Sequence, residues 1–377
     1  MVSDSNDAIS LGVGEPDFLT PYFIRESAVK SINKGYTKYT QNNGLKELRE
    51  EISSYLYKRF SLNYPIDEII VTVGASEGID LALRAIVSDG DEILIPDPSY
   101  VSYSPCVTLA GGVPIAIKTF QKDSFRITKE NLEQAISEKT KAIIMPYPNN
   151  PTGAIMGKAH LEEIIPLIIE HNLMVISDEI YAELTYTSKH YSIAAYEDMR
   201  ERTIYINGFS KAFAMTGWRL GYVCAPKEIL NAMYKIHQYC IMCAPTTSQY
   251  AGIAALRQSQ EDDFATINQM VEEYDGRRRF LLRRFKQMGL SCFEPKGAFY
   301  LFPYVGDLGL NGEQFSLLLL KYEKIALVPG NAFGDFGEDY VRISYAYSMK
   351  TLIKAADKIE AFIKKVKNNQ INTDTIP

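Results

Sequence analysis

The sequence has few cysteines, and their spacing does not suit a cross-linked or metal-binding fold. The 377 residues include five cysteines, an odd number without the spacing of a disulfide framework. Cys240 and Cys243 form one CxxC, with His237 three residues earlier. A structural zinc site needs about four ligands, and the sequence has no second such pair. We therefore expect no disulfides and no metal site, and we interpret the CxxC as part of a packed segment, with metal or redox chemistry as the minor alternative.

Long apolar runs, a targeting pattern and an excess of positive charge are also missing. No apolar run reaches membrane-spanning length, and the N-terminal MVSDSNDAIS lacks a basic and then apolar signal. We expect a cytoplasmic protein without membrane contact. The formal net charge of −6 argues against a nucleic-acid partner. The basic cluster GRRRFLLRR at 276–284 contains apolar residues, and we interpret it as a helix with one buried and one solvated side.

Common nucleotide-binding fingerprints are absent as well. The chain contains no GxxxxGK[ST] motif. The segment GVGEPD at 12–17 lacks the third glycine of a dinucleotide fingerprint, and it does not follow a long strand. Neither motif therefore predicts a nucleotide site, and the sequence has no internal repeat.

Alternating apolar and amphipathic segments in the middle of the chain predict an α/β architecture. Continuous apolar runs separated by helix-like stretches, such as 158–172, are typical of a parallel sheet covered on both faces. After a helical region at 246–288, short strands mix with helices and indicate a smaller α+β part. The length predicts two domains, which we place at 35–270 (large) and at 1–34 with 271–377 (small). The expected strands of the large sheet are 68–74, 91–97, 113–119, 141–147, 173–179 and 203–209, and those of the smaller part are 291–297, 298–304, 325–330 and 340–346.

Polar residues follow several of the predicted parallel strands. Ligands bind at the carboxyl ends of such strands, so we expect these residues to converge on one rim. They are Gly74-Ala75-Ser76, Asp97-Pro98-Ser99-Tyr100, Asn149-Asn150-Pro151, Asp178-Glu179-Ile180-Tyr181 and Ser210-Lys211.

One lysine and one arginine stand in the otherwise uncharged segment TIYINGFSKAFAMTGWRLGY at 203–222. Desolvation lowers the pKa of a lysine and frees an amine that attacks carbonyls. Pyridoxal phosphate needs such a lysine, a carboxylate on its ring nitrogen and a phosphate cradle. Lys211, Asp178 and Arg219, with the small-residue turn 74–76 at a helix N-terminus, supply these groups. Taken singly, each feature has a structural explanation as common as the cofactor-binding one. The turn can be an ordinary strand–helix connection, and Asp178 can be a helix cap or an ion-pair partner.

Five motifs follow one another along the chain: GVGEPDF, PNNPTG, SDEIYAEL, SKAFAMTGWRLGY and YVRISYA. Together they resemble the class I/II aminotransferases of pyridoxal-phosphate fold type I. The resemblance spans Ile9 to Val366 and is closest to the branch with bacterial aromatic, aspartate and N-acetyl-diaminopimelate aminotransferases. It implies a mostly parallel seven-stranded sheet in a large cofactor-binding domain, a smaller α+β domain, and a homodimer with shared active sites.

The resemblance also implies roles for residues around the cofactor. Lys211 would form the Schiff base and act as the general base. Asp178 would pair with the ring nitrogen, while Tyr181 and Asn150 would bind the phenolic oxygen, and the Asn150–Pro151 bond would be cis. Tyr100 would stack on the ring. The phosphate would be held by Gly74, Ala75, Ser76, Ser210, Arg219 and, from the neighbouring subunit, Tyr39.

The remaining roles concern the substrate. Arg342 would hold the α-carboxylate by a bidentate pair, with Gly14 alongside and Tyr100 and Asn150 in reach. Gly208 stands where many relatives carry a phosphate-binding serine, and we expect Ser210 to compensate.

The places where relatives put a cation for a distal carboxylate are neutral here. Ser76 occupies one of them, and the stretch 237–249, which would come from the partner, has no lysine or arginine. Tyr239, Ile241, Met242 and Phe299 offer apolar surface instead. We therefore expect an aromatic or large apolar amino donor and a 2-oxo acid acceptor. The alternatives are an aspartate or N-acetyl-diaminopimelate aminotransferase, a pyridoxal-phosphate-dependent cystathionine β-lyase, and, least favoured, a non-enzymatic pyridoxal-phosphate sensor.

Overall fold

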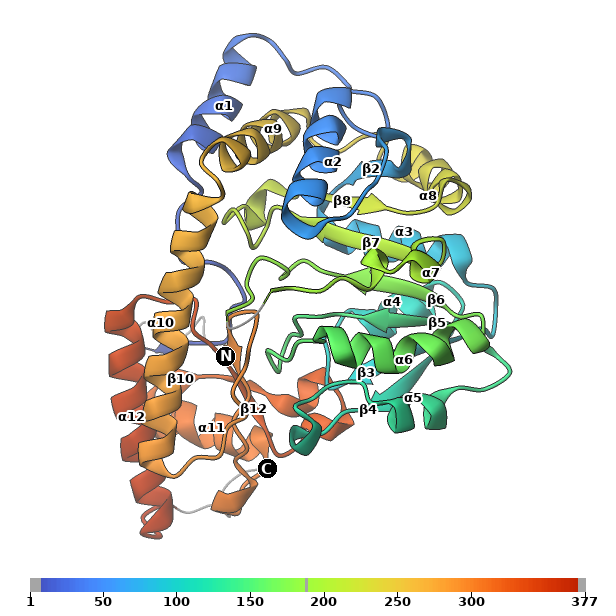
Figure 1. The fold of residues 1–377 in the computed structure, drawn as a ribbon. Coiled ribbons are helices and arrows are strands. Elements are labelled where there is room, and N and C mark those ends of the chain that lie inside the picture. The colour runs from blue at the N-terminus through green and yellow to red at the C-terminus, as the bar shows by residue number, and fades with distance from the viewer. Residues whose placement is uncertain (1–7, 187–188, 372–377) are drawn as a thin grey trace.

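A seven-stranded sheet forms the centre of the larger part of the molecule (Figure 1). The structure is a computed structural model that describes residues 8–186 and 189–371. The strand order is β2-β8-β7-β6-β5-β3-β4, and every neighbouring pair is parallel except those that include β8. The mostly parallel sheet predicted from the sequence is confirmed. Its strands are β2 (Ile69–Thr72), β3 (Glu92–Asp97), β4 (Val113–Lys118), β5 (Thr140–Met145), β6 (Met174–Asp178), β7 (Thr203–Gly208) and β8 (Gly221–Cys224).

Helices cover both faces of this sheet because its strands carry apolar side chains on both sides. Ile93 and Ile95 face one core, with α3 (Gly74–Ile86), α4 (Tyr103–Leu109) and α8 (Lys227–Cys240). Leu94 faces another core with α5 (Lys129–Ala135) and α6 (Lys158–Glu170). The core around β2 and β8 includes residues of α1 (Tyr22–Asn33), α2 (Lys46–Phe60) and α9 (Thr246–Glu261). The alternation of side chains along each strand thus divides the buried residues between the two faces.

One strand of the structure was not predicted from the sequence, and one predicted strand was wrong. The strand β8 was not predicted, because its four residues GYVC form a short run directly behind the lysine segment. The predicted strand 291–297 does not form; its residues make only isolated bridges, at Cys292 and Gly297. Pro295 cannot donate to a ladder, and the backbone N–H groups of Lys296 and Gly297 both donate to the Gly153 carbonyl instead.

The C-terminal elements build a further core at the lower left of Figure 1. A three-stranded antiparallel sheet of β9 (Tyr300–Leu301), β11 (Val328–Pro329) and β12 (Val341–Ser344) packs with α11 (Gly312–Glu323) and α12 (Met349–Lys367). The N-terminal β1 (Ile9–Ser10) pairs with β10 (Ile325–Ala326). The first strand of the chain therefore pairs with a strand from the last third of the sequence. Short helices complete the fold at α7 (Glu197–Arg200) and at 66–68, 121–123, 193–195, 216–218, 306–308, 330–333 and 335–337.

The long helix α10 (Ala265–Met288) runs from the upper to the lower part of Figure 1. It contains the basic cluster, and the predicted buried side is present because Arg277 and Arg278 are buried. Arg277 contacts Asp17 at 2.7 Å, and Arg278 contacts Glu294 at 2.9 Å. These two arginines therefore link α10 to one segment that precedes it in the sequence and to one that follows it.

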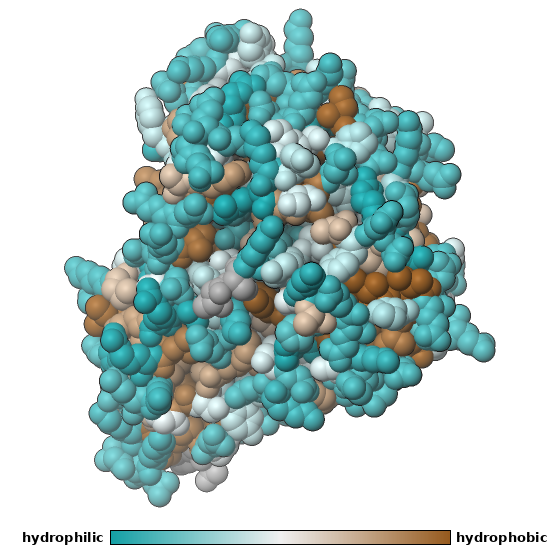
Figure 2. All heavy atoms as spheres, viewed as in Figure 1, coloured by the Kyte–Doolittle hydropathy of each residue, from teal (hydrophilic) through white to brown (hydrophobic). Residues whose placement is uncertain are grey.

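The visible surface is mostly hydrophilic, with apolar side chains in separate patches (Figure 2). None of the helices within residues 8–186 and 189–371 combines the length and the apolar character needed to cross a membrane. We retain the division into a large unit at 35–270 and a small unit at 1–34 with 271–377 as a proposal.

Candidate active site

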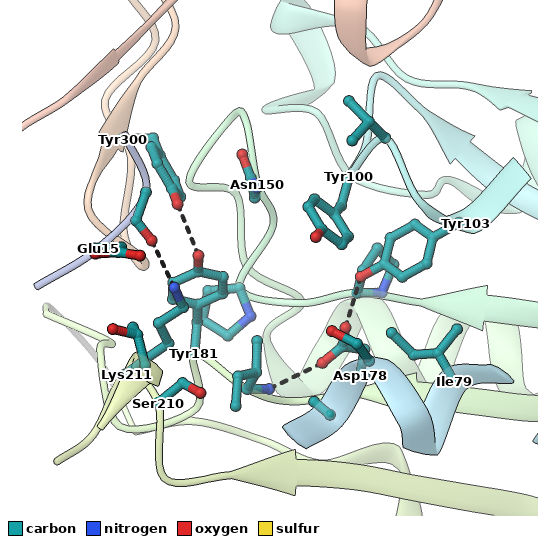
Figure 3. A pocket seen from close by; sticks show the side chains of 18 of the residues that line it. Glu15, Ile79, Tyr100, Tyr103, Asn150, Asp178, Tyr181, Ser210, Lys211 and Tyr300 are labelled. Atoms are coloured by element: carbon teal, nitrogen blue, oxygen red, sulfur yellow. Dashed lines mark hydrogen bonds between the residues drawn. The ribbon is translucent and has the colours of Figure 1, made fainter. Parts of the chain in front are cut away.

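A pocket of about 670 Å³ opens at the carboxyl ends of the parallel strands (Figure 3). The predicted convergence on one rim is therefore present in the structure. Gly74 lies next to this pocket without lining it, and Tyr39 is 80% exposed and lies apart from it. The other predicted site residues all line it: Gly14, Ala75, Ser76, Tyr100, Asn150, Asp178, Tyr181, Ser210, Lys211, Arg219 and Arg342.

Lys211 follows β7 and extends its amine into the pocket. Its Nζ donates to the Gly14 carbonyl at 2.6 Å. The amine also lies 5.6 Å from the centre of the Tyr181 ring and 5.5 Å from that of Phe299. Burial lowers the pKa of Lys211 to about 8, although the nearby Glu15 carboxylate acts in the opposite direction. At pH 7 roughly a tenth of this amine is therefore uncharged, far more than at the ordinary pKa of a lysine, and this favours a role as a base or nucleophile.

Asp178 ends β6 with a buried carboxyl group. Tyr103 Oη donates to Asp178 Oδ2 at 2.8 Å, and the Ile180 N–H donates to Oδ1 at 3.2 Å. Burial raises the pKa of Asp178, while these two hydrogen bonds act to lower it. A cation facing this carboxylate from the pocket would stabilise its ionised form. Tyr103 was not predicted; its position one helical turn after Tyr100, at the start of α4, is the signal that could have identified it.

The N-terminus of α3 lies at the pocket. Ala75 and Ser76 line the pocket at the first turn of a 13-residue helix, where free N–H groups and the helix dipole favour an anion. Gly74 has a φ of +74°, and a Cβ there would lie 2.7 Å from Arg219 Nη2. Arg219 itself donates to the Thr216 carbonyl at 3.0 Å. A guanidinium and a helix N-terminus thus meet because residue 74 has no side chain.

Gly208 is equally constrained by its surroundings. A Cβ at Gly208 would lie 3.0 Å from both the Gly221 Cα and the Leu220 carbonyl oxygen. The close approach of β7 and β8 gives a physical reason for glycine here, where many relatives carry serine. Ser210 lines the pocket two residues later.

Arg342, on β12, faces the opposite end of the pocket. Its Nη1 donates to Asn150 Oδ1 at 2.9 Å, and its Nη2 donates to the Gly12 carbonyl. The guanidinium lies 4.6 Å from the centre of the Tyr300 ring and 4.8 Å from that of Phe333. The Asn150–Pro151 bond is cis, as predicted. Arginine and amide donors at one end of a pocket suit a carboxylate ligand.

Tyr181 contacts a second tyrosine that the sequence reasoning missed. Its hydroxyl lies 2.8 Å from that of Tyr300, on β9. Both rings are buried and meet nearly edge to face. In Figure 3 the pair stands beside Lys211 and opposite Asn150. Tyr300 follows Phe299 in the segment AFYLFPY, and nothing in its local pattern distinguishes it from a core residue.

The CxxC segment lies at the end of α8, outside the pocket lining. His237 is buried and its ring nitrogens lie 2.6 Å from Glu77 Oε1 and 2.9 Å from the Asn42 carbonyl oxygen. Cys240 is exposed and Cys243 is half-buried. The histidine is therefore part of a polar contact between α8, α3 and the 42–44 turn.

Comparisons with known proteins place the chain in a family. The profile of the family "Aminotransferase class I and II" matches residues 6–359. The aspartate aminotransferase of Pyrococcus abyssi is 47% identical over 96% of this chain and 93% of that protein. The aromatic-amino-acid aminotransferase 2 of Thermococcus litoralis is 45% identical over 95% of this chain and 92% of that protein. A crystal structure of the aromatic aminotransferase from Pyrococcus horikoshii OT3 superposes with a TM-score of 0.93 at 46% identity, covering 97% of this chain and all of that one.

These relatives are aminotransferases, which supports amino transfer over the β-elimination alternative. The family generally depends on pyridoxal phosphate and acts on amino acids and 2-oxo acids. The relatives include both aspartate and aromatic enzymes, so they leave the amino donor open. With a matching profile over most of its length and the same fold, this chain belongs to the class I and II aminotransferases and is a transaminase.

Proposed function

We propose that this transaminase binds pyridoxal 5′-phosphate in the described pocket. The residues fit the group in three respects. The buried Asp178 carboxylate faces the pocket and suits a protonated ring nitrogen. The amine of Lys211 reaches the same cavity. The first turn of α3 and Arg219 suit a phosphate.

When bound, the cofactor supplies an electron sink that makes the substrate α-proton acidic. Lys211 Nζ would take that proton from the substrate α-carbon, for which burial prepares it by lowering its pKa to about 8. Arg342 and Asn150 would bind the α-carboxylate, and the pocket walls would exclude water. Tyr181 would donate to the phenolic oxygen and Tyr100 would lie on the ring face.

We further propose that an aromatic or large apolar amino acid is the preferred donor and a 2-oxo acid the acceptor. The observation that supports this is the charge of the pocket. Among the described lining residues, Lys211, Arg219 and Arg342 are the only cations, and each already has a role. A distal carboxylate would be left without a cation, which is costly in a desolvated site. The remaining wall is apolar at Val13, Val101, Val328 and Phe333.

A homodimer with shared sites belongs to the same proposal. Tyr39 and Tyr239 are 80% and 85% exposed, and Ile241 and Met242 are more than two-fifths exposed. These exposed aromatic and apolar side chains suit contact with a second copy. In that arrangement Tyr39 would reach the phosphate of the neighbouring subunit, and 239–242 would border its substrate.

A donor panel tests the function. The purified protein is assayed with and without added pyridoxal phosphate, with 2-oxoglutarate as acceptor and tyrosine, phenylalanine or aspartate as donor. We expect activity only with the cofactor, and a kcat/KM for tyrosine or phenylalanine above that for aspartate. If the kcat/KM for aspartate exceeds that for both tyrosine and phenylalanine by more than about tenfold, the missing-cation argument is wrong. A tenfold difference corresponds to roughly 1.4 kcal/mol in transition-state binding.

A further inference from the structure

Tyr300 connects two functional side chains of the pocket. Its hydroxyl lies 2.8 Å from that of Tyr181, and its ring lies beneath the Arg342 guanidinium at 4.6 Å. In Figure 3 its side chain points from β9 into the pocket toward Tyr181. The residue comes from the C-terminal sheet, whereas Tyr181 follows β6 of the large sheet. One side chain therefore bridges the two parts of the fold at the place where substrate and cofactor would meet.

The position of this hydroxyl is determined by its neighbours. Tyr300 is 1% exposed. A Cβ at Gly14 would lie 2.3 Å from Tyr300 Oη, so the hydroxyl occupies space that only glycine leaves open. The ring also contacts Phe299 and Tyr181. Tyr300 is thus held in place independently of any ligand.

Each tyrosine hydroxyl has only one hydrogen, and this determines which of Tyr181 and Tyr300 donates to the other once a ligand is present. A phenol carries one hydrogen and can accept further bonds. If Tyr181 donates its hydrogen to the phenolic oxygen of the cofactor, Tyr300 must donate to Tyr181. A hydroxyl that accepts one hydrogen bond becomes a better donor in the next, because such chains polarise one another.

We propose that Tyr300 is a positioning residue of this transaminase: its hydroxyl orients and polarises Tyr181 as a donor to the cofactor, and its ring supports Arg342. The inference rests on the proposed function, because the ligand of Tyr181 is the cofactor. A stronger donor stabilises negative charge on the phenolic oxygen. It would thereby lower the proton affinity of the Lys211 nitrogen when that nitrogen is bonded to the cofactor.

The test compares Tyr300→Phe with the wild-type holoenzyme. We expect the pH-dependent transition of the long-wavelength absorbance band to move to higher pH by about half a unit. The value of kcat should fall about fivefold, the usual effect of one neutral hydrogen bond, while KM stays within about twofold. Tyr300→Leu also removes the ring beneath Arg342, and its KM for the amino donor should rise as well.

Two controls separate this effect from a general loss of packing. Tyr345 Oη donates to the Ala298 carbonyl at 3.1 Å, and Tyr345 is buried without lining the pocket. Tyr345→Phe removes a comparable hydroxyl and should leave the absorbance transition unchanged. In a double-mutant cycle, Tyr300→Phe should produce no further shift in a Tyr181→Phe background, because its hydroxyl acts through Tyr181.

The possible outcomes distinguish the two proposals. A wild-type protein that shows no cofactor band contradicts the proposed function itself. If the wild-type band titrates but Tyr300→Phe leaves both its transition and kcat unchanged, only the inference about Tyr300 fails. A full shift that persists in the Tyr181→Phe background also overturns it, since Tyr300 would then act by another route.

Discussion

Replacing Lys211 with methionine should stabilise the cofactor-free protein while abolishing its activity. Burial lowers the pKa of this amine from 10.5 to about 8. The protonated amine is therefore less favourable in the folded than in the unfolded state. A difference of this size corresponds to about 3 kcal/mol at neutral pH. The variant also loses the hydrogen bond to the Gly14 carbonyl, worth about 1 kcal/mol, so the net gain should be about 2 kcal/mol.

The pH dependence of this gain has a definite sign. Below pH 8 the amine is charged in both states, and the full cost of burying it is present. Between about pH 8 and 10.5 the folded protein holds the neutral amine while the unfolded chain still binds the proton, so the wild type gains stability as the pH rises. The advantage of Lys211→Met should therefore be largest at pH 7 and decrease steadily above pH 8.

The assay is urea unfolding of both proteins after removal of the cofactor, at pH 7, 8 and 9.5. Lys354→Met, at an exposed position of α12, is the matched control and should change the stability little at any of these values. Our account of the buried amine would be refuted by a Lys211→Met protein no more stable than wild type at pH 7, or by a difference that does not decrease toward pH 9.5.

Two further predictions concern carboxyl groups at the strand ends. Tyr103→Phe removes a hydrogen-bond donor from Asp178, so the pKa of that carboxyl should rise further. The dissociation constant of pyridoxal phosphate should then increase about tenfold. An unchanged constant in a fluorescence titration of the cofactor-free protein would contradict this. Asp97 accepts from the N–H groups of Asp335 and Phe336, and burial raises its pKa to about 6. The unfolded chain loses this proton at the ordinary carboxyl pKa, whereas the folded protein keeps it up to about pH 6, so stability falls as the pH rises between these two values and the loss is complete above pH 6. Asp97→Asn should therefore raise stability more at pH 7.5 than at pH 4 in thermal unfolding. An equal effect at both values would show that the cost of ionisation is absent.

Several residues of the candidate site could be predicted from local sequence patterns alone. Lys211, Asp178 and Arg219 are charged residues that follow apolar runs or lie in uncharged segments, and such positions can be recognised without a structure. Parallel strands bring their carboxyl ends to one edge, so the order of the strands along the chain already predicts that these residues meet. The cis Asn150–Pro151 bond followed from the family resemblance in the same way.

Tyr103 and Tyr300 show where that reasoning ends. The chain has 25 tyrosines. Tyr103 is marked only by its spacing from Tyr100, and Tyr300 stands out by neither charge, spacing nor neighbours. Tyr300 becomes distinctive only because β9, from the last third of the chain, brings its hydroxyl to Tyr181. The unpredicted β8 is a similar case, since its antiparallel pairing with β2 and β7 depends on long-range contacts.

The sequence by itself determined the α/β class and the lysine–aspartate–arginine set, because periodicity and isolated charges are properties of short segments, and its motifs carried the resemblance to the transaminase family. The tertiary structure alone decided which neutral side chains complete the pocket and how strongly burial shifts the pKa values of Lys211 and Asp178. Desolvation and hydrogen bonding depend on atoms far apart in the chain, and these are brought together only when the cores have formed.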